Sequence, residues 1–315
     1  MRDLDVDAIL AGLEEPLPEG HRSGMVALVG RPNVGKSTLL NAMVGEKVAI
    51  VTEVPGTTRN AIRGVVTRED AQIVFLDTPG VAKPKTLLTR RLNDLVRDTW
   101  AGVDVVCLLV DVADGVGGGD EYLARELASI TTPVVVVANK EDRVRRDSKQ
   151  LVPQLARLAE WLPDAEIVPT SALDGFNVAH LLDVLVGMLP EGPRLFPSGM
   201  VTDQPEQQLA AEILREKLMA RMRQELPHSI AVVVEDVRVA EHREDLLEVD
   251  AVVHVERDSQ KGIVLGRRGE NLKAAATDAR RELEVVFGAK VFLDVRVKVA
   301  PDWQRDPKQL GRLGY

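Results

Sequence analysis

The sequence predicts an α/β protein in which a doubly wound, mainly parallel sheet is followed by a smaller α+β domain. Three observations lead to this fold class. Short apolar runs alternate with helix-patterned stretches over residues 25–189, a proline- and glycine-rich stretch follows, and beyond it helices and strands come in a different order. Alternating strands and helices are typical of a sheet that is covered by helices on both faces and binds its ligand at the carboxyl ends of its strands.

In the first unit, strands are expected at residues 25–29, 72–76, 103–110, 133–138 and 166–169, and helices at residues 37–44, 87–100, 120–130, 149–162 and 178–188. The apolar runs do not alternate strictly between polar and apolar residues. Runs of that kind favour parallel strands that are buried on both faces.

The second unit has a different predicted order of elements. A helix is expected at residues 206–225, strands at residues 230–239 and 246–255, a helical pair around Gly266, and a last strand at residues 291–299. We therefore expect a disordered leader over residues 1–23, a first domain over residues 24–190, a linker over residues 191–205, and a second domain over residues 206–315 that ends in a helix.

Composition limits the function classes. The chain has 315 residues and a formal net charge of −9, which argues against indiscriminate nucleic-acid binding but does not exclude a local basic face. Its single cysteine, Cys107, lies in an apolar run, so we expect a core residue and a reducing, cytoplasmic environment. No apolar stretch approaches the roughly 18 residues that a membrane-spanning helix needs.

A glycine-rich loop follows the first predicted strand and opens the first predicted helix. It reads Gly30-Arg31-Pro32-Asn33-Val34-Gly35-Lys36-Ser37 and is followed by Thr38. This is the P-loop pattern, in which backbone N–H groups surround the β-phosphate of a nucleotide. Lys36 would reach the β- and γ-phosphates, and the Ser37 hydroxyl would ligate Mg²⁺.

A second motif, Asp77-Thr78-Pro79-Gly80, follows the strand predicted at residues 72–76. Alone, it reads equally well as a turn that ends a strand. Beside a P-loop, the Asp77 carboxylate is expected to hold the magnesium through water, and the Gly80 N–H to sense the γ-phosphate.

Between these motifs, residues 55–59 show no helix or strand pattern and contain two adjacent threonines, Thr57 and Thr58. A loop with a threonine hydroxyl is typical of a switch that becomes ordered when γ-phosphate and Mg²⁺ are bound. Either threonine fits this role, and we favour Thr58 as the metal ligand. The catalytic group would then comprise Lys36, Thr58 and Gly80.

The base is predicted by Asn139-Lys140-Glu141-Asp142, which ends the strand at residues 133–138. The Asp142 carboxylate can accept from guanine N1–H and from the exocyclic amine, whereas adenine would leave it unpaired at a cost of about 1–3 kcal/mol or more. Asn139 would address the other edge of the purine, and Lys140 would cover the ring. Ser171-Ala172-Leu173 completes the pocket with the Ala172 N–H for guanine O6. A nucleotide kinase is disfavoured because this motif is specific to guanine switches.

The residue after Gly80 is Val81. Its side chain cannot orient an attacking water as a glutamine does, so intrinsic hydrolysis should be slow.

These motifs resemble the Era branch of bacterial GTPases, in which a hydrophobic residue replaces the switch glutamine. The resemblance implies a role for Asn33 in holding K⁺, which would act like an arginine finger. It covers about residues 25–315 and includes the closing segment Leu310-Gly311-Arg312-Leu313-Gly314-Tyr315.

The second half is similar to a type II KH domain, both in its order of elements and in the loop Ile263-Val264-Leu265-Gly266-Arg267-Arg268-Gly269-Glu270. A G-x-x-G turn clamps a single-stranded nucleic-acid backbone in such domains, although the motif alone is a weak signal. Residues 259–315 hold twelve Lys and Arg against seven Asp and Glu. The expected RNA-binding residues are Lys261, Ile263, Val264, Gly266, Arg267, Arg268, Gly269 and Lys273.

The resemblance implies a monomeric GTP/GDP switch that binds the 3′ region of small-subunit ribosomal RNA and assists assembly of that subunit. It also implies a cytoplasmic protein with peripheral contact to the inner face of the membrane. The alternative is a membrane-surface signalling GTPase whose C-terminal domain contacts proteins or lipids.

Overall fold

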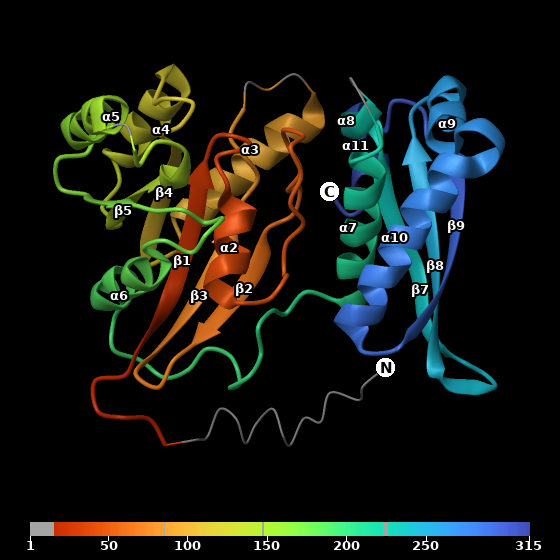
Figure 1. Ribbon diagram of the computed structural model, residues 1–315, viewed down its shortest axis with the longest axis horizontal. Helices are drawn as coiled ribbons and strands as arrows, with labels where there is room; N and C mark the ends of the chain where they lie inside the picture. Colours follow the sequence, from red (N-terminus) through yellow and green to blue (C-terminus); the bar gives the residue numbers. More distant parts are fainter. Residues whose placement is uncertain (1–15, 83, 85, 147, 223–225) are drawn as a thin grey trace.

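The structure is a computed structural model that describes residues 16–315 except 83, 85, 147 and 223–225 (Figure 1). The described part of the chain forms two units, each built on its own sheet. The leader predicted over residues 1–23 lies mostly outside the described residues, which start at Pro16. Its predicted end is corrected, because Arg22 and Ser23 already belong to the first strand.

The first unit is a six-stranded sheet with the strand order β2-β3-β1-β4-β5-β6. Its strands are β1 (Arg22–Gly30), β2 (Ile62–Thr67), β3 (Ala71–Asp77), β4 (Val105–Asp111), β5 (Val134–Asn139) and β6 (Glu166–Pro169). Its helices are α2 (Lys36–Val44), α3 (Leu87–Trp100), α4 (Gly118–Leu127), α5 (Ser148–Trp161) and α6 (Val178–Met188). The α/β fold class predicted from the sequence is confirmed.

Side chains alternate between the two faces of this sheet. In β4, Cys107 and Leu109 pack with α2 and α6, whereas Leu108 and Val110 pack with α3, α4 and α5. Both faces are therefore buried, which explains why the strand sequences are continuously apolar.

Strand β2 was not predicted, and it corrects the expectation of a parallel sheet at this edge. It pairs antiparallel with β3, whereas the other pairs in the sheet are parallel. Its sequence contains Arg63 and Gly64, so it lacks the continuous apolar run of the central strands. The Gly64 position faces α2, where a Cβ would lie 2.6 Å from Leu40 Cδ1.

The second unit is a three-stranded sheet with the order β7-β8-β9, in which β7 and β8 are antiparallel and β8 and β9 are parallel. Its strands are β7 (Ala231–Ala240), β8 (Arg243–Val255) and β9 (Lys290–Val299). Its helices are α7 (Glu206–Met219), α8 (Leu226–Ser229), α9 (Asp258–Leu265), α10 (Glu270–Phe287) and α11 (Pro307–Arg312). Helices α7, α9 and α10 share one hydrophobic cluster with the sheet. Helix α7 ends at Met219, before residue 225 where we had expected the helix to end.

The two units meet along α7, which stands between the two sheets (Figure 1). Ile50, from the first unit, is buried in the cluster of the second unit. Leu88 at the start of α3 packs with Trp303, Leu310 and Leu313 from the C-terminal part. We call residues 50–59, which contain the predicted switch, the switch segment; it has no helix or strand. Among the described residues, no helix has the length and apolarity needed to cross a membrane.

Helix α10 offers a matched pair of core and surface positions. Leu283 is 0% exposed and Val285 is 81% exposed. We expect Leu283→Ala to lower the free energy of unfolding by about 2–5 kcal/mol because it leaves a cavity. Val285→Ala should change it by less than about 0.5 kcal/mol. Urea denaturation followed by circular dichroism measures both, and equal effects would contradict this packing.

Candidate nucleotide and nucleic-acid sites

The P-loop turns sharply between β1 and α2. Other atoms approach its glycines so closely that there is no room for a Cβ. Gly35 has a φ of +101°, and a Cβ there would lie 2.3 Å from Asn139 Nδ2. Lys36 Nζ curls back to the carbonyls of Gly30 (3.3 Å) and Arg31 (3.1 Å). Burial lowers the pKa of Lys36 to about 8, although the carboxylate of Asp77 acts in the opposite direction. The ammonium therefore lies inside the loop, where a phosphate would meet it.

Three oxygens from three segments meet beside this loop. Ser37 Oγ donates to Asp77 Oδ2 at 2.6 Å and lies 3.1 Å from Thr58 Oγ1, which is 3.3 Å from Asp77 Oδ2. Strand pairing accounts for the meeting, since β1 and β3 are parallel neighbours that end at the same edge of the sheet. Asp77 is fully buried, which raises the pKa of its carboxyl, whereas Lys36, Ser37 and Thr58 lower it. Its Oδ1 has no hydrogen-bond partner among the described residues.

The two threonines of the switch segment point in different directions. Thr57 Oγ1 lies 2.5 Å from Thr52 Oγ1 and donates to the Val54 carbonyl at 2.7 Å, within the segment itself. Only Thr58 turns its hydroxyl toward Ser37 and Asp77. This geometry favours Thr58 over Thr57 as the metal ligand.

A cavity of about 430 Å³ lies over these groups. Among the predicted residues it is lined by Pro32, Asn33, Gly35, Lys36, Ser37, Thr38, Thr58, Gly80 and Lys140. A larger cavity, of about 1060 Å³, lies between α3 and α4, and of the P-loop it touches only Arg31 and Pro32. We call the cavity of about 430 Å³ the phosphate cavity. Arg31 points away from it, because its Nε donates to Asp120 at 2.8 Å.

The Asp77–Gly80 motif is held against the P-loop. Thr78 Oγ1 donates to the Leu28 carbonyl at 2.7 Å, and a Cβ on Gly80 would lie 2.6 Å from Pro32 N. The N–H of Val81 donates to the Gly30 carbonyl at 3.3 Å. Val81 is partly buried against the cluster of α3, α4 and α5.

The predicted base-binding motifs lie together because β5 and β6 are neighbours. Ser171 Oγ donates to Asp142 Oδ1 at 2.7 Å. Asn139 uses both ends of its amide for the fold: Nδ2 donates to the Val34 carbonyl at 2.8 Å, and Oδ1 accepts from Ala172 N at 3.1 Å. Asn139 thus joins the P-loop to the 171–173 loop, in addition to any contact with a base. Leu173 is 81% exposed.

Sequence reasoning missed two acidic residues at this site. Lys140 Nζ donates to the Asn33 carbonyl at 2.8 Å and pairs with Asp111 at 2.6 Å. Asp111 ends β4 just as Asp77 ends β3, so its position at a strand's carboxyl end was the available signal. Glu53 contributes through its backbone: its carbonyl accepts from Asn33 Nδ2 at 2.7 Å. A backbone contact of that kind leaves no signal in the sequence.

The second unit presents the predicted glycine turn at its surface. Gly266 and Gly269 have φ values of +71° and +81°, and Arg268 has +54°. Arg267 and Arg268 are exposed, as is Lys273, whereas Lys261 is partly exposed. The arginine side chains are therefore available to an anionic backbone.

A groove of about 460 Å³ runs between α10 and β9. It is lined by Gly269, Leu272, Lys273, Ala276, Thr277, Arg280, Phe292, Leu293 and Val295. Only Gly269 and Lys273 of this set were predicted. Ile263 is 55% exposed, but Val264 is fully buried in the cluster of the second unit. The prediction for Val264 is therefore corrected: it is a core residue, because it lies on the face of α9 that packs on the sheet.

The Gly35 contact can be tested with a matched glycine. Gly45 also has a positive φ (+82°), but a Cβ there meets nothing within 4 Å. Both alanine variants carry backbone strain of about 1–2 kcal/mol, and only Gly35→Ala displaces Asn139. We expect Gly35→Ala to abolish binding of a fluorescent GDP analogue and Gly45→Ala to retain it, with melting temperatures measured for both. Retained binding in Gly35→Ala would contradict this geometry.

Comparisons with known proteins agree with this geometry. Residues 25–140 match the family model described as 50S ribosome-binding GTPase, and residues 225–304 match the KH domain. The chain is 50% identical to GTPase Era of Mycolicibacterium smegmatis, over 93% of this chain and 99% of that protein. It is 52% identical to GTPase Era of Mycobacterium tuberculosis, over 93% and 98%.

Two solved structures are similar over nearly their whole length. One is Era in complex with MgGDPNP and nucleotides 1506–1542 of 16S ribosomal RNA, with a TM-score of 0.90 and 39% identity over 94% of this chain and 99% of that one. The other is a variant of Aquifex aeolicus Era bound to GDP and AlF4⁻, with a TM-score of 0.90 and 39% identity over 93% and 99%. With identity of this level across nearly the full length of its relatives, the chain belongs to the Era family of GTPases.

Proposed function

We propose that this GTPase binds the 3′ region of small-subunit ribosomal RNA through its second unit and assists assembly of that subunit. One observation carries the proposal: a single chain joins a phosphate cavity to an exposed glycine turn with two arginines beside an open groove. The Era structure solved with 16S ribosomal RNA supports the choice of RNA, since its chain matches this one across both units.

The nucleotide would lie across the carboxyl ends of β1, β3, β5 and β6. We propose that the P-loop N–H groups and Lys36 hold the phosphates and that Asp142 selects guanine. The Ala172 N–H, which donates to Asn139 Oδ1 in this structure, would turn to guanine O6 when the base is bound. The 171–173 loop and Lys140 would enclose the base.

The oxygens of Ser37, Thr58 and Asp77 fit a magnesium ion in their chemistry. They are hard oxygen donors within 3.3 Å of one another, and the buried Asp77 Oδ1 lacks a partner among the described residues. Bound magnesium would supply positive charge to the β- and γ-phosphate oxygens. We propose that Ser37 and Thr58 ligate it and that Asp77 holds it through water.

Hydrolysis would then depend on positioning. Val81 offers no side-chain group that can orient the attacking water, so backbone groups of the switch segment and the Gly80 N–H must do so. We infer a slow intrinsic turnover, which suits a timed switch.

The finer proposals concern potassium and location. Asn33 lies against the Glu53 carbonyl, so an amide oxygen and a backbone carbonyl could both face a monovalent cation once the amide turns its oxygen to the site. The ion would add positive charge beside the transferred phosphate.

A cytoplasmic location, a monomeric state and peripheral contact with the membrane remain predictions. The buried, free Cys107 suits a reducing compartment.

RNA binding tests the main proposal. We expect Arg267→Ala/Arg268→Ala to weaken binding of a 16S 3′-end oligonucleotide at least about tenfold, because phosphate contacts are lost. The control is Arg243→Ala, an exposed arginine on β8 that pairs with Asp245. Filter binding should be done with GDP and with a non-hydrolysable GTP analogue, and we expect the analogue to favour RNA.

Unchanged RNA affinity in the double variant would contradict the RNA assignment. Liposome binding that survives the double change, without any RNA binding, would support the membrane-surface alternative. Equal affinities with the two nucleotides would contradict the coupling between nucleotide and RNA.

Potassium dependence is a separate prediction. We expect GTP hydrolysis to be faster in KCl than in NaCl at equal ionic strength, and Asn33→Ala to remove that difference. Phosphate release at saturating Mg-GTP measures both. Equal rates of the unaltered protein in the two salts would remove the potassium proposal.

A further inference from the structure

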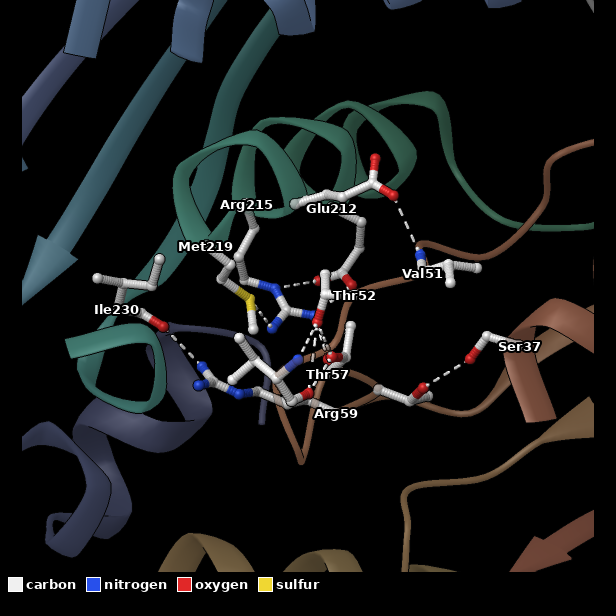
Figure 2. A network of polar contacts seen from close by, with 12 residues as sticks. Ser37, Val51, Thr52, Thr57, Arg59, Glu212, Arg215, Met219 and Ile230 are labelled. Atoms are coloured by element: carbon white, nitrogen blue, oxygen red, sulfur yellow. Dashed lines mark hydrogen bonds and ion pairs between the residues drawn. The ribbon is translucent and has the colours of Figure 1, made fainter. Parts of the chain in front are cut away.

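The switch segment is held from outside the nucleotide-binding unit. Figure 2 shows its residues between the P-loop helix on one side and α7 on the other. The carbonyl of Thr57 accepts from Arg215 Nη2, and the next residue, Thr58, turns its hydroxyl toward Ser37 and Asp77. A bond to the second unit is thus one residue away from a proposed metal ligand.

Arg215 is fully buried, and the nitrogens of its guanidinium point at defined partners. Its Nε and Nη2 donate to the two carboxylate oxygens of Glu212, at 3.0 and 2.5 Å, and its Nη1 lies 3.5 Å from the sulfur of Met219. A bidentate pair of this kind fixes the plane of the guanidinium. Taking a charge out of water is expensive unless all of its partners are present. The Thr57 carbonyl is therefore part of what keeps Arg215 buried.

Helix α7 holds the switch segment with several residues of one face. Residues 212, 215, 216 and 219 are spaced so that they lie on one side of a helix. Glu216 accepts the N–H of Val51 at 3.1 Å and pairs with Lys47 at 2.6 Å. Two backbone groups of the switch segment, the Val51 N–H and the Thr57 carbonyl, thus bind the same helix face.

The other side of Thr58 is fixed as well. The Arg59 guanidinium lies over the rings of Trp303 (5.4 Å) and Tyr315 (5.5 Å), which stack on each other. Its Nη1 donates to the Ile230 carbonyl at 2.7 Å. Both neighbours of Thr58 are thereby held by the second unit, which restrains the backbone that carries the Thr58 hydroxyl.

We propose that Arg215 is a positioning residue for GTP hydrolysis: through the Thr57 carbonyl, it places Thr58 where the metal and γ-phosphate need it. The KH-bearing unit is in this sense part of the catalytic apparatus, and not only an RNA-binding appendage. This inference rests on the nucleotide and magnesium binding proposed above. A displacement of about 1 Å at a reacting centre can lower a rate about 10²-fold, so one lost bond here should be measurable.

The alternative is that Arg215 only holds the two units together. Arg215→Met removes all donors at similar volume, and Arg215→Lys keeps the charge beside Glu212 but loses the fork. Arg221→Met is the matched control, since Arg221 is an exposed arginine just after α7 that pairs with Asp278 on α10. Arg63→Met is a second control, since Arg63 pairs with Asp203, in the stretch that precedes α7, and not with α7 or the switch segment.

The measurements are kcat with saturating GTP, the Mg²⁺ concentration at half-maximal rate, and the affinities for GDP and a non-hydrolysable GTP analogue. We expect Arg215→Met to lower kcat about 10- to 100-fold and to raise the Mg²⁺ concentration needed for half-maximal rate. It should also lower the affinity for the analogue more than the affinity for GDP. Arg215→Lys should lie between it and the unaltered protein, and Arg221→Met should match the unaltered protein. Hydrogen exchange of residues 50–59 with the analogue bound should increase in Arg215→Met.

Two results would overturn the inference: a kcat and Mg²⁺ requirement in both Arg215 variants equal to those of the controls, or equal losses of GDP and analogue affinity. Should Arg215→Met fail to fold, Arg215→Lys decides by the same criteria. Failure of the unaltered protein to hydrolyse GTP would instead contradict the proposed function, so the two failures are distinguishable.

Discussion

Three oxygens meet at one point in this protein, on Ser37, Thr58 and Asp77, and they come from a helix start, a loop and a strand end. Placing a carboxylate in a buried site is unfavourable without a partner, and burial accordingly raises the pKa of Asp77. The parallel pairing of β1 with β3 imposes the meeting, because it brings the P-loop and the Asp77 motif to one edge. A cation between these oxygens would relieve the electrostatic penalty that the fold creates.

The same point links the two units. Thr58 belongs to a segment without helix or strand, and such a segment holds its shape only through the groups that bind it. Here α7 and the Trp303–Tyr315 pair bind it from one side, and the oxygen cluster meets it from the other. The contacts that hold the segment are therefore shared between α7 and the oxygen cluster.

The sequence patterns predicted some elements of the structure more accurately than others. The bounds predicted for the helices at residues 87–100 and 178–188 coincide with α3 and α6, because apolar spacing marks both helices clearly. Strand β2 escaped prediction because an edge strand with Arg63 and Gly64 carries little apolar signal. Val264 was assigned to the RNA surface from its place in the loop motif, yet it is fully buried, because a motif does not say which face of α9 turns inward.

The residues themselves determined the two-unit α/β organisation and the order of the phosphate and guanine motifs, since apolar periodicity and short-range loop geometry are local properties. The contacts between segments that are distant in the sequence could be identified only from the tertiary structure. The bond from Arg215 to the Thr57 carbonyl spans 158 positions and ends on a backbone atom that every residue type possesses, so no side-chain pattern can encode it. The choice between the two threonines was likewise visible only in the structure, where Thr57 bonds the Val54 carbonyl within its own segment and Thr58 reaches Asp77.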